Sequence, residues 1–162
     1  MALLTIAGRS RLAQAVADQA ETIYLALGAG DPDWDVTPVE PSVNETALVA
    51  EIGRRLLTNF WFVVPDQEGD LVTPSGTYSV SVDPTPYLLL RFVFDLTDSP
   101  GATIRELGMI VGGTVVAGLP AGQQYFAPSE VDDPGVLLGV EHVTAFTRSM
   151  DVRQIFQYVL PF

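Results

Sequence analysis

The chain has 162 residues, 48% of them hydrophobic, with no cysteine, no lysine and a single histidine. Thiolate nucleophiles, catalytic lysines and zinc sites made of cysteines or paired histidines are therefore excluded, because the residue types that they need are absent. The net charge of −12 repels phosphate backbones and anionic lipid, so nucleic-acid binding is not expected. No apolar stretch is long enough for membrane insertion.

The N-terminal third predicts two helices around one strand. Apolar residues at helical spacing predict a short helix over residues 10–20 with Ser10 as its N-cap. Alternation then predicts a strand over residues 23–28 that ends in glycine. Residues 31–43 are acidic and proline-rich and predict an extended loop, in which Trp34 needs cover from another segment. The apolar spacing over residues 46–57 favours a second short helix.

The remainder of the chain is predicted to be mostly strands. Bulky, β-branched or alternating residues mark five of them, at residues 60–64, 77–82, 87–96, 104–111 and 140–148. A further strand at residues 114–117 is expected to form a hairpin with residues 104–111, and residues 118–135 are expected to be mostly loop. The apolar end at residues 152–162 either closes this domain or docks on a neighbour.

Together these elements predict an α+β, mostly β fold. We expect an antiparallel sheet or sandwich with a short N-terminal helix and one further short helix. A chain of this length buries enough surface to need no disulfide or metal, so a single domain over residues 1–162 is expected.

The acidic loop offers the best candidate for a metal site. The alternate spacing of Asp31, Asp33 and Asp35 resembles the start of a calcium-binding loop. However, Val36 and Ser42 stand where such a loop needs glycine and a bidentate glutamate. A solvated acidic loop is the preferred interpretation, and cation binding there is left open. No cofactor is expected, since the glycine pairs lack a P-loop lysine and the dinucleotide-binding pattern.

His142 is the only candidate for acid–base catalysis. It stands next to Glu141 in an alternating segment, but no Gly-x-Ser-x-Gly turn accompanies it. A histidine on a strand is usually a structural residue, so the chain is not expected to be an enzyme.

Several segments together resemble a known family. The first is the run from Ile23 to Asp35, IYLALGAGDPDWD, followed by prolines and then by residues 46–55, TALVAEIGRR. Residues 104–109, IRELGM, with the pair Gly112-Gly113 resemble an "Ile-x-Glu-Ile-Gly-Leu" strand and its glycine turn. These motifs look like the N-terminal attachment region of bacteriophage tail-fibre or collar-fibre proteins, and the resemblance covers about the first two thirds of the chain.

The resemblance implies a virion assembly protein. No long fibre shaft is present, so a small tail, baseplate or collar component is expected, which is made in the host cytoplasm and located in the virion tail. It is expected to form a symmetric homo-oligomer, a trimer or a hexamer, that joins other tail, baseplate or fibre proteins. The candidate interface residues are Trp34, Arg54, Arg55, Ile155, Phe156, Tyr158, Leu160 and Phe162.

A different class of function is kept as an alternative. The chain would then be a carbohydrate- or peptide-binding module whose ligand platform is made of exposed aromatic residues such as Trp34, Trp61 and Tyr125.

Overall fold

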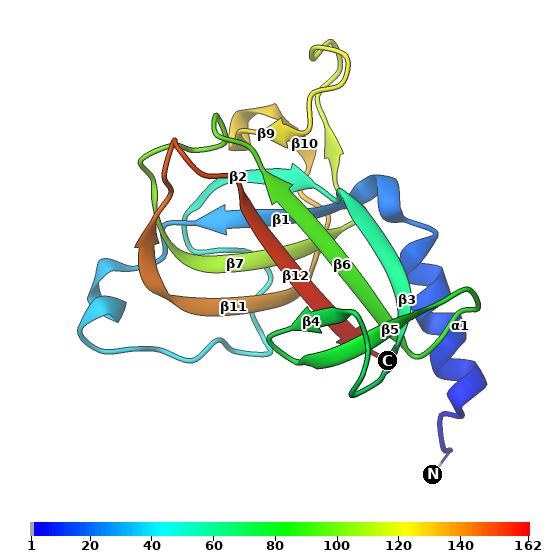
Figure 1. The fold of residues 1–162 in the computed structure, drawn as a ribbon. Helices are drawn as coiled ribbons and strands as arrows, with labels where there is room; N and C mark the ends of the chain where they lie inside the picture. Colours follow the sequence, from blue (N-terminus) through cyan, green and yellow to red (C-terminus); the bar gives the residue numbers. More distant parts are fainter. Residues whose placement is uncertain (1) are drawn as a thin grey trace. The chain divides into compact units, whose positions relative to one another are not determined.

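The computed structural model describes residues 2–162, and the chain divides into two compact units (Figure 1). Unit 1 comprises the segment that ends at Ala20 together with Leu57–Phe92 and Ile155–Phe162. Unit 2 comprises Glu21–Leu56 and Val93–Gln154. Each unit is therefore assembled from segments that are distant in the sequence.

Unit 2 is built on a five-stranded sheet with the strand order β11-β7-β1-β2-β9. The strands are β1 (Ile23–Gly28), β2 (Glu51–Leu56), β7 (Thr103–Val111), β9 (Tyr125–Phe126) and β11 (Val136–Thr147). All four pairings between these neighbours are antiparallel. The short strands β8 (Thr114–Val115) and β10 (Val131–Asp133) form a separate two-stranded sheet.

The core of unit 2 lies on β1 and its neighbours. All six residues of β1 are buried, so both faces of this central strand are covered. Tyr24, Ala26, Ile110 and Phe126 form one apolar cluster, onto which half-buried side chains such as Leu48 pack. This part of the chain also contains short 3-10 segments. They are η1 (Ala20–Thr22), which leads into β1, η2 (Pro32–Asp35) and η3 (Pro128–Glu130).

Unit 1 combines a helix with a second five-stranded sheet. The helix is α1 (Ile6–Ala17), and the sheet has the order β12-β6-β3-β5-β4. Its strands are β3 (Asn59–Pro65), β4 (Leu71–Thr73), β5 (Gly76–Ser81), β6 (Tyr87–Phe94) and β12 (Gln154–Pro161). Leu88, Leu89 and Leu90 of β6 are fully buried in succession, so side chains on both faces of this strand are covered.

The predicted fold class is confirmed: the protein is mostly β, with antiparallel sheets and one N-terminal helix. The helix begins earlier than predicted, at Ile6, because the Thr5 hydroxyl caps it by accepting the Gly8 amide hydrogen at 3.1 Å. Ser10 lies within the helix and donates instead to the Ile6 carbonyl oxygen.

Two local predictions were wrong. Residues 51–56 form strand β2 rather than a helix, because pairing with β1 and β9 on its two sides overrides the helical spacing of the apolar residues. The strand at Thr114–Val115 pairs with β10 and not with β7, so the expected hairpin does not form. Within residues 2–162, no helix has the length and apolar character that crossing a membrane requires.

Candidate interaction site

The long loop between β1 and β2 is fastened to the sheet by two consecutive residues of β7. Successive side chains of a strand point to opposite faces, so Arg105 and Glu106 reach the loop from two sides. Both residues belong to the IRELGM segment, and the loop contains the GAGDPDWD segment. The two segments that carry the family resemblance are therefore in contact in the fold.

Glu106 binds three backbone amides at the two ends of the loop. Its carboxylate accepts hydrogen bonds from Gly30 at 3.3 Å, Val49 at 3.1 Å and Ala50 at 2.9 Å. The side chain is fully buried. A buried carboxylate is tolerated only where hydrogen bonds replace its lost hydration, and these amides supply them. Gly28 makes room for the carboxylate, since a Cβ there would lie 2.3 Å from Glu106 Oε1.

Arg105 holds the middle of the loop through Asp35. Its guanidinium makes a two-point ion pair with the Asp35 carboxylate at 2.9 and 2.7 Å, and it also donates to the Ala29 carbonyl oxygen at 3.2 Å. The hydrogen bonds from Arg105 lower the pKa of Asp35 below its usual value. Asp31 caps η2 by accepting the Asp33 amide hydrogen. Two of the three aspartates in the candidate cation loop thus serve the fold of the loop itself.

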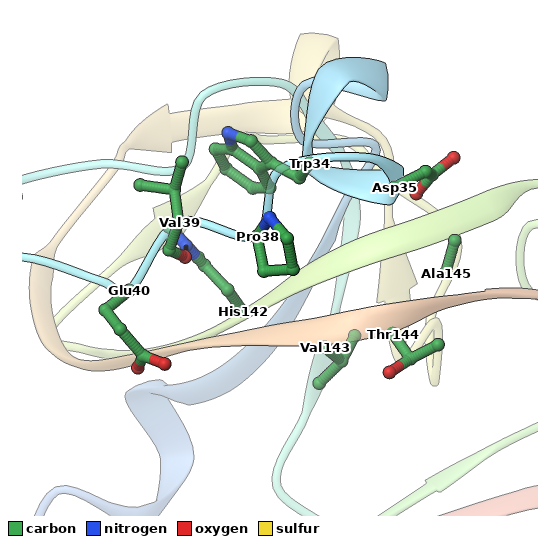
Figure 2. A pocket seen from close by; sticks show the side chains of 9 residues that line it. All are labelled: Trp34, Asp35, Pro38, Val39, Glu40, His142, Val143, Thr144 and Ala145. Carbon is green, nitrogen blue, oxygen red and sulfur yellow. Dashed lines mark hydrogen bonds between the residues drawn. The ribbon is translucent and has the colours of Figure 1, made fainter.

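Trp34 and His142 form the floor of a pocket of about 350 Å³ beside the loop. Their rings are stacked, with centroids 4.1 Å apart and an interplanar angle of 23°. Figure 2 shows Trp34 projecting from η2 and His142 from β11, with Pro38 and Val39 of the loop beside them. The cover that Trp34 needs is therefore the imidazole of His142.

His142 also binds the loop through its Nδ1 atom. Nδ1 lies 2.6 Å from the Val39 carbonyl oxygen, which can only accept, so Nδ1 carries the proton. The other ring nitrogen, Nε2, is buried and lies 3.8 Å from a carboxylate oxygen of Glu45. This geometry gives His142 a positioning role in the loop. No group of three or more histidine, aspartate or glutamate side chains in residues 2–162 is arranged to hold a metal ion.

The loop that is held in this way exposes apolar and acidic side chains together. Val36 is 86% exposed, Val39 is 48% exposed and Val43 is fully exposed. Asp33 and Glu40 of the same loop are exposed as well. We call these five residues the loop surface. It is a fixed surface and not a solvated tail, because Glu106, Arg105 and His142 each bind the backbone or a side chain of the loop.

The two candidate interface arginines form ion pairs within unit 2. Arg54 is 3% exposed, and its guanidinium pairs with Glu51 at 2.7 and 2.8 Å and donates to the Pro134 carbonyl oxygen at 2.9 Å. Arg55 pairs with Asp95 and Asp98. The carboxylate partners of both side chains therefore lie within unit 2.

The C-terminal candidates lie on β12, an edge strand of the sheet of unit 1, except Phe162, which directly follows it. Ile155 is 49% exposed, whereas Phe156, Tyr158, Leu160 and Phe162 are half-buried. The Phe162 amide donates to the Pro86 carbonyl oxygen at 2.9 Å. The C-terminal segment thus completes the sheet and still leaves Ile155 accessible.

The three aromatic residues of the alternative hypothesis are each half-buried. Trp34 stacks on His142, and Trp61 packs on the cluster of buried residues around Val63. The Tyr125 hydroxyl forms a hydrogen bond with the Ser99 hydroxyl, and its ring makes an edge-to-face contact with Phe94. Trp34 and Tyr125 belong to unit 2 and Trp61 to unit 1. A ligand would have to use what remains exposed of these side chains.

Sequence reasoning did not identify Arg105 and Glu106 as organisers of the loop. The signal was present, because a charged pair near the start of the otherwise apolar run Ile104–Val111 is unusual for a central strand. Gly108 lies close to the loop as well: a Cβ there would lie 2.8 Å from Leu48 Cδ2, so the Leu48 side chain would have to shift.

Comparison with protein-family models matches residues 1–162 to a family described as "Baseplate wedge 3 tail fiber network component". A search of curated proteins found no match.

Proposed function

Because the chain belongs to the baseplate wedge 3 tail fiber network family, we propose that it joins neighbouring proteins of a bacteriophage tail as a symmetric homo-oligomer, a trimer or a hexamer. Its partners are other baseplate or fibre proteins of the virion. It is made in the host cytoplasm, and it acts by binding rather than by catalysis.

The observation that carries this proposal is the fixed loop surface. Three exposed valines in a segment held by Glu106, Arg105 and His142 present apolar area with little freedom left to lose on binding. Exposed apolar patches rimmed by polar residues are typical of protein–protein contact sites. Trp34 supports this surface from beneath through its stack on His142.

The C-terminal strand supplies a second proposed contact. The edge of β12 carries Ile155, and an edge strand presents unpaired backbone groups to a neighbour. We include Phe156, Tyr158, Leu160 and Phe162 as flanking residues of this contact. Arg54 and Arg55 act indirectly in the proposal, by fixing the carboxylates of Glu51, Asp95 and Asp98.

The test is the mass of the purified protein in solution, measured by light scattering coupled to size exclusion over a range of concentrations. We expect a defined trimer or hexamer for the unaltered chain. Val43→Asp and Ile155→Asp should each shift the mass towards the monomer. Val82→Asp is the matched control, because Val82 is 98% exposed and lies outside both proposed contacts.

A monomer at every concentration would refute the homo-oligomer. If the monomer also gains thermal stability on adding an oligosaccharide or a peptide, the binding-module alternative is favoured instead.

A further inference from the structure

The arginines of the chain are almost all used within the fold. Four of the eight form ion pairs with carboxylates: Arg54, Arg55, Arg105 and Arg153. Arg148 is 1% exposed and donates to the carbonyl oxygens of Asp95 and Asp98. Arg91 lies half-buried on β6. Two arginines remain, and both are on α1.

Arg9 and Arg11 are exposed, and in the described part of the chain neither one pairs with a carboxylate. Arg9 donates to the Phe162 backbone oxygen at 3.1 Å, and no carboxylate side chain of the described residues pairs with it. No aspartate or glutamate occurs before Asp18. The N-terminal segment is therefore a cationic patch on a chain whose net charge is −12.

The same segment exposes large apolar side chains. Leu3 is 86% exposed and Ile6 is 75% exposed, while Leu4 and Leu12 are each 48% exposed. We call residues 3–12 the basic apolar segment. Its composition is unusual for a water-exposed segment, because four large aliphatic side chains are exposed within a few residues of the two arginines.

The loop surface of unit 2 has the complementary character. Asp33 and Glu40 provide carboxylates, and Val36, Val39 and Val43 provide apolar area. The adjoining pocket of about 350 Å³ has Trp34, Pro38, Val39 and Val143 in its walls, with Glu40 among the residues that line it. Its size is near the lower limit for small-molecule sites and suits an aliphatic side chain.

We propose that the basic apolar segment of one copy docks on the loop surface of a second copy, with Leu3 or Ile6 in the Trp34–His142 pocket and with Arg9 and Arg11 facing Asp33 and Glu40. This inference rests on the proposed function and identifies the contact that makes the oligomer. The occupant is a second copy because copies with a net charge of −12 repel one another, so self-assembly needs the unpaired cations at the contact. A contact between two different patches closes into a ring when the rotation between copies permits it.

The experiment compares charge-reversed forms of the full chain by light scattering. Arg9→Glu with Arg11→Glu reverses the basic apolar segment, and Asp33→Arg with Glu40→Arg reverses the loop surface. Each double variant alone should bind itself about tenfold or more weakly than the unaltered chain, since like charges then face each other. A chain that carries all four substitutions should regain assembly, because in every copy each altered patch again meets its opposite.

Glu68→Arg with Asp70→Arg is the matched control, since both residues are exposed on unit 1 and lie outside the basic apolar segment and the loop surface. It should assemble like the unaltered chain. Unchanged assembly of either test variant would overturn this inference and leave the proposed oligomer intact. Loss of assembly in each double variant without recovery in the chain that carries all four substitutions would overturn the pairing of the two patches. A monomeric unaltered chain would overturn the proposed function and this inference together.

Discussion

The carboxylate of Glu106 accepts the amide hydrogen of Ala50 at 2.9 Å, although 56 residues separate the two in the chain. The same carboxylate binds Gly30 at the other end of the loop. One buried side chain of β7 therefore closes a loop of about twenty residues at its base. The closure requires a carboxylate at this position, because all three partners are backbone N–H donors and both oxygens of an ionised carboxylate accept hydrogen bonds.

Glu106→Gln tests this closure. Glutamine keeps the shape of the side chain but replaces one acceptor oxygen with a donor, which would face backbone amides that are also donors. Hydrogen bonds to charged groups contribute about 1.5–3 kcal/mol each, so the free energy of unfolding should fall by roughly that amount or more. Amide hydrogen exchange at Val49, Ala50 and Gly30 should accelerate. Glu68→Gln, at an exposed position, should change neither quantity, and unaltered exchange in Glu106→Gln would show that the loop is held by other contacts.

Gly28→Ala tests the space that the carboxylate occupies. The new Cβ would lie 2.3 Å from Glu106 Oε1 and 2.6 Å from its Cδ, so the carboxylate must move away from the amides. Overpacking of this kind costs about 1–3 kcal/mol, and the loop amides should exchange as they do in Glu106→Gln. The control is Gly139→Ala in β11, where nothing lies within 4 Å of the added Cβ and stability should stay within about 0.5 kcal/mol. Fully additive effects of Gly28→Ala and Glu106→Gln would argue against a shared mechanism.

The sequence specifies the strands better than it specifies the site. The strand at residues 23–28 was predicted with its observed bounds, because alternation and an exit glycine are local signals. The helix predicted over residues 46–57 was wrong, because its apolar spacing fits a helix while the hydrogen-bonding partners of the observed strand lie elsewhere in the sequence. The role of Glu106 depends on amides more than fifty residues away, and no local pattern reports those.

The ion pair between Asp35 and Arg105 predicts a pH dependence. Hydrogen bonds from Arg105 lower the pKa of Asp35 in the folded protein below its usual value of 3.8. The ionised Asp35 carboxylate therefore stabilises the fold fully at pH values above the pKa that Asp35 has in the unfolded chain. This stabilisation is lost as the pH falls through the lower pKa that Asp35 has in the folded protein. Urea unfolding at several pH values should show that Asp35→Asn is less stable than the unaltered chain at pH 7 and that this gap closes below pH 3.8.

Asp70→Asn is the control for this pH series. Asp70 is exposed and, among the described residues, forms no ion pair, so its substitution should produce no gap that depends on pH. A gap for Asp35→Asn that stays constant down to pH 2 would mean that the pair with Arg105 does not stabilise the fold through the charge of Asp35.

His142→Ala is expected to release Trp34 and the loop surface together. The substitution removes the ring stacked 4.1 Å from Trp34 and the hydrogen bond to the Val39 carbonyl oxygen. An aromatic pair contributes about 0.5–1.5 kcal/mol beyond its buried area, and a neutral hydrogen bond contributes a similar amount, so the free energy of unfolding should fall by about 1–3 kcal/mol. Trp34 fluorescence, measured with Trp61→Phe as the background, should shift to longer wavelength as water reaches the indole.

His142→Phe separates the two contributions. Phenylalanine can keep the stack on Trp34 but cannot donate to Val39, so the emission should stay close to that of the unaltered chain while part of the stability is lost. If self-assembly uses the pocket beside Trp34, His142→Ala should also weaken it more than His142→Phe does, because only the alanine variant loses the floor of the pocket. Equal emission in the alanine and phenylalanine variants would show that the loop keeps Trp34 covered without the ring of residue 142.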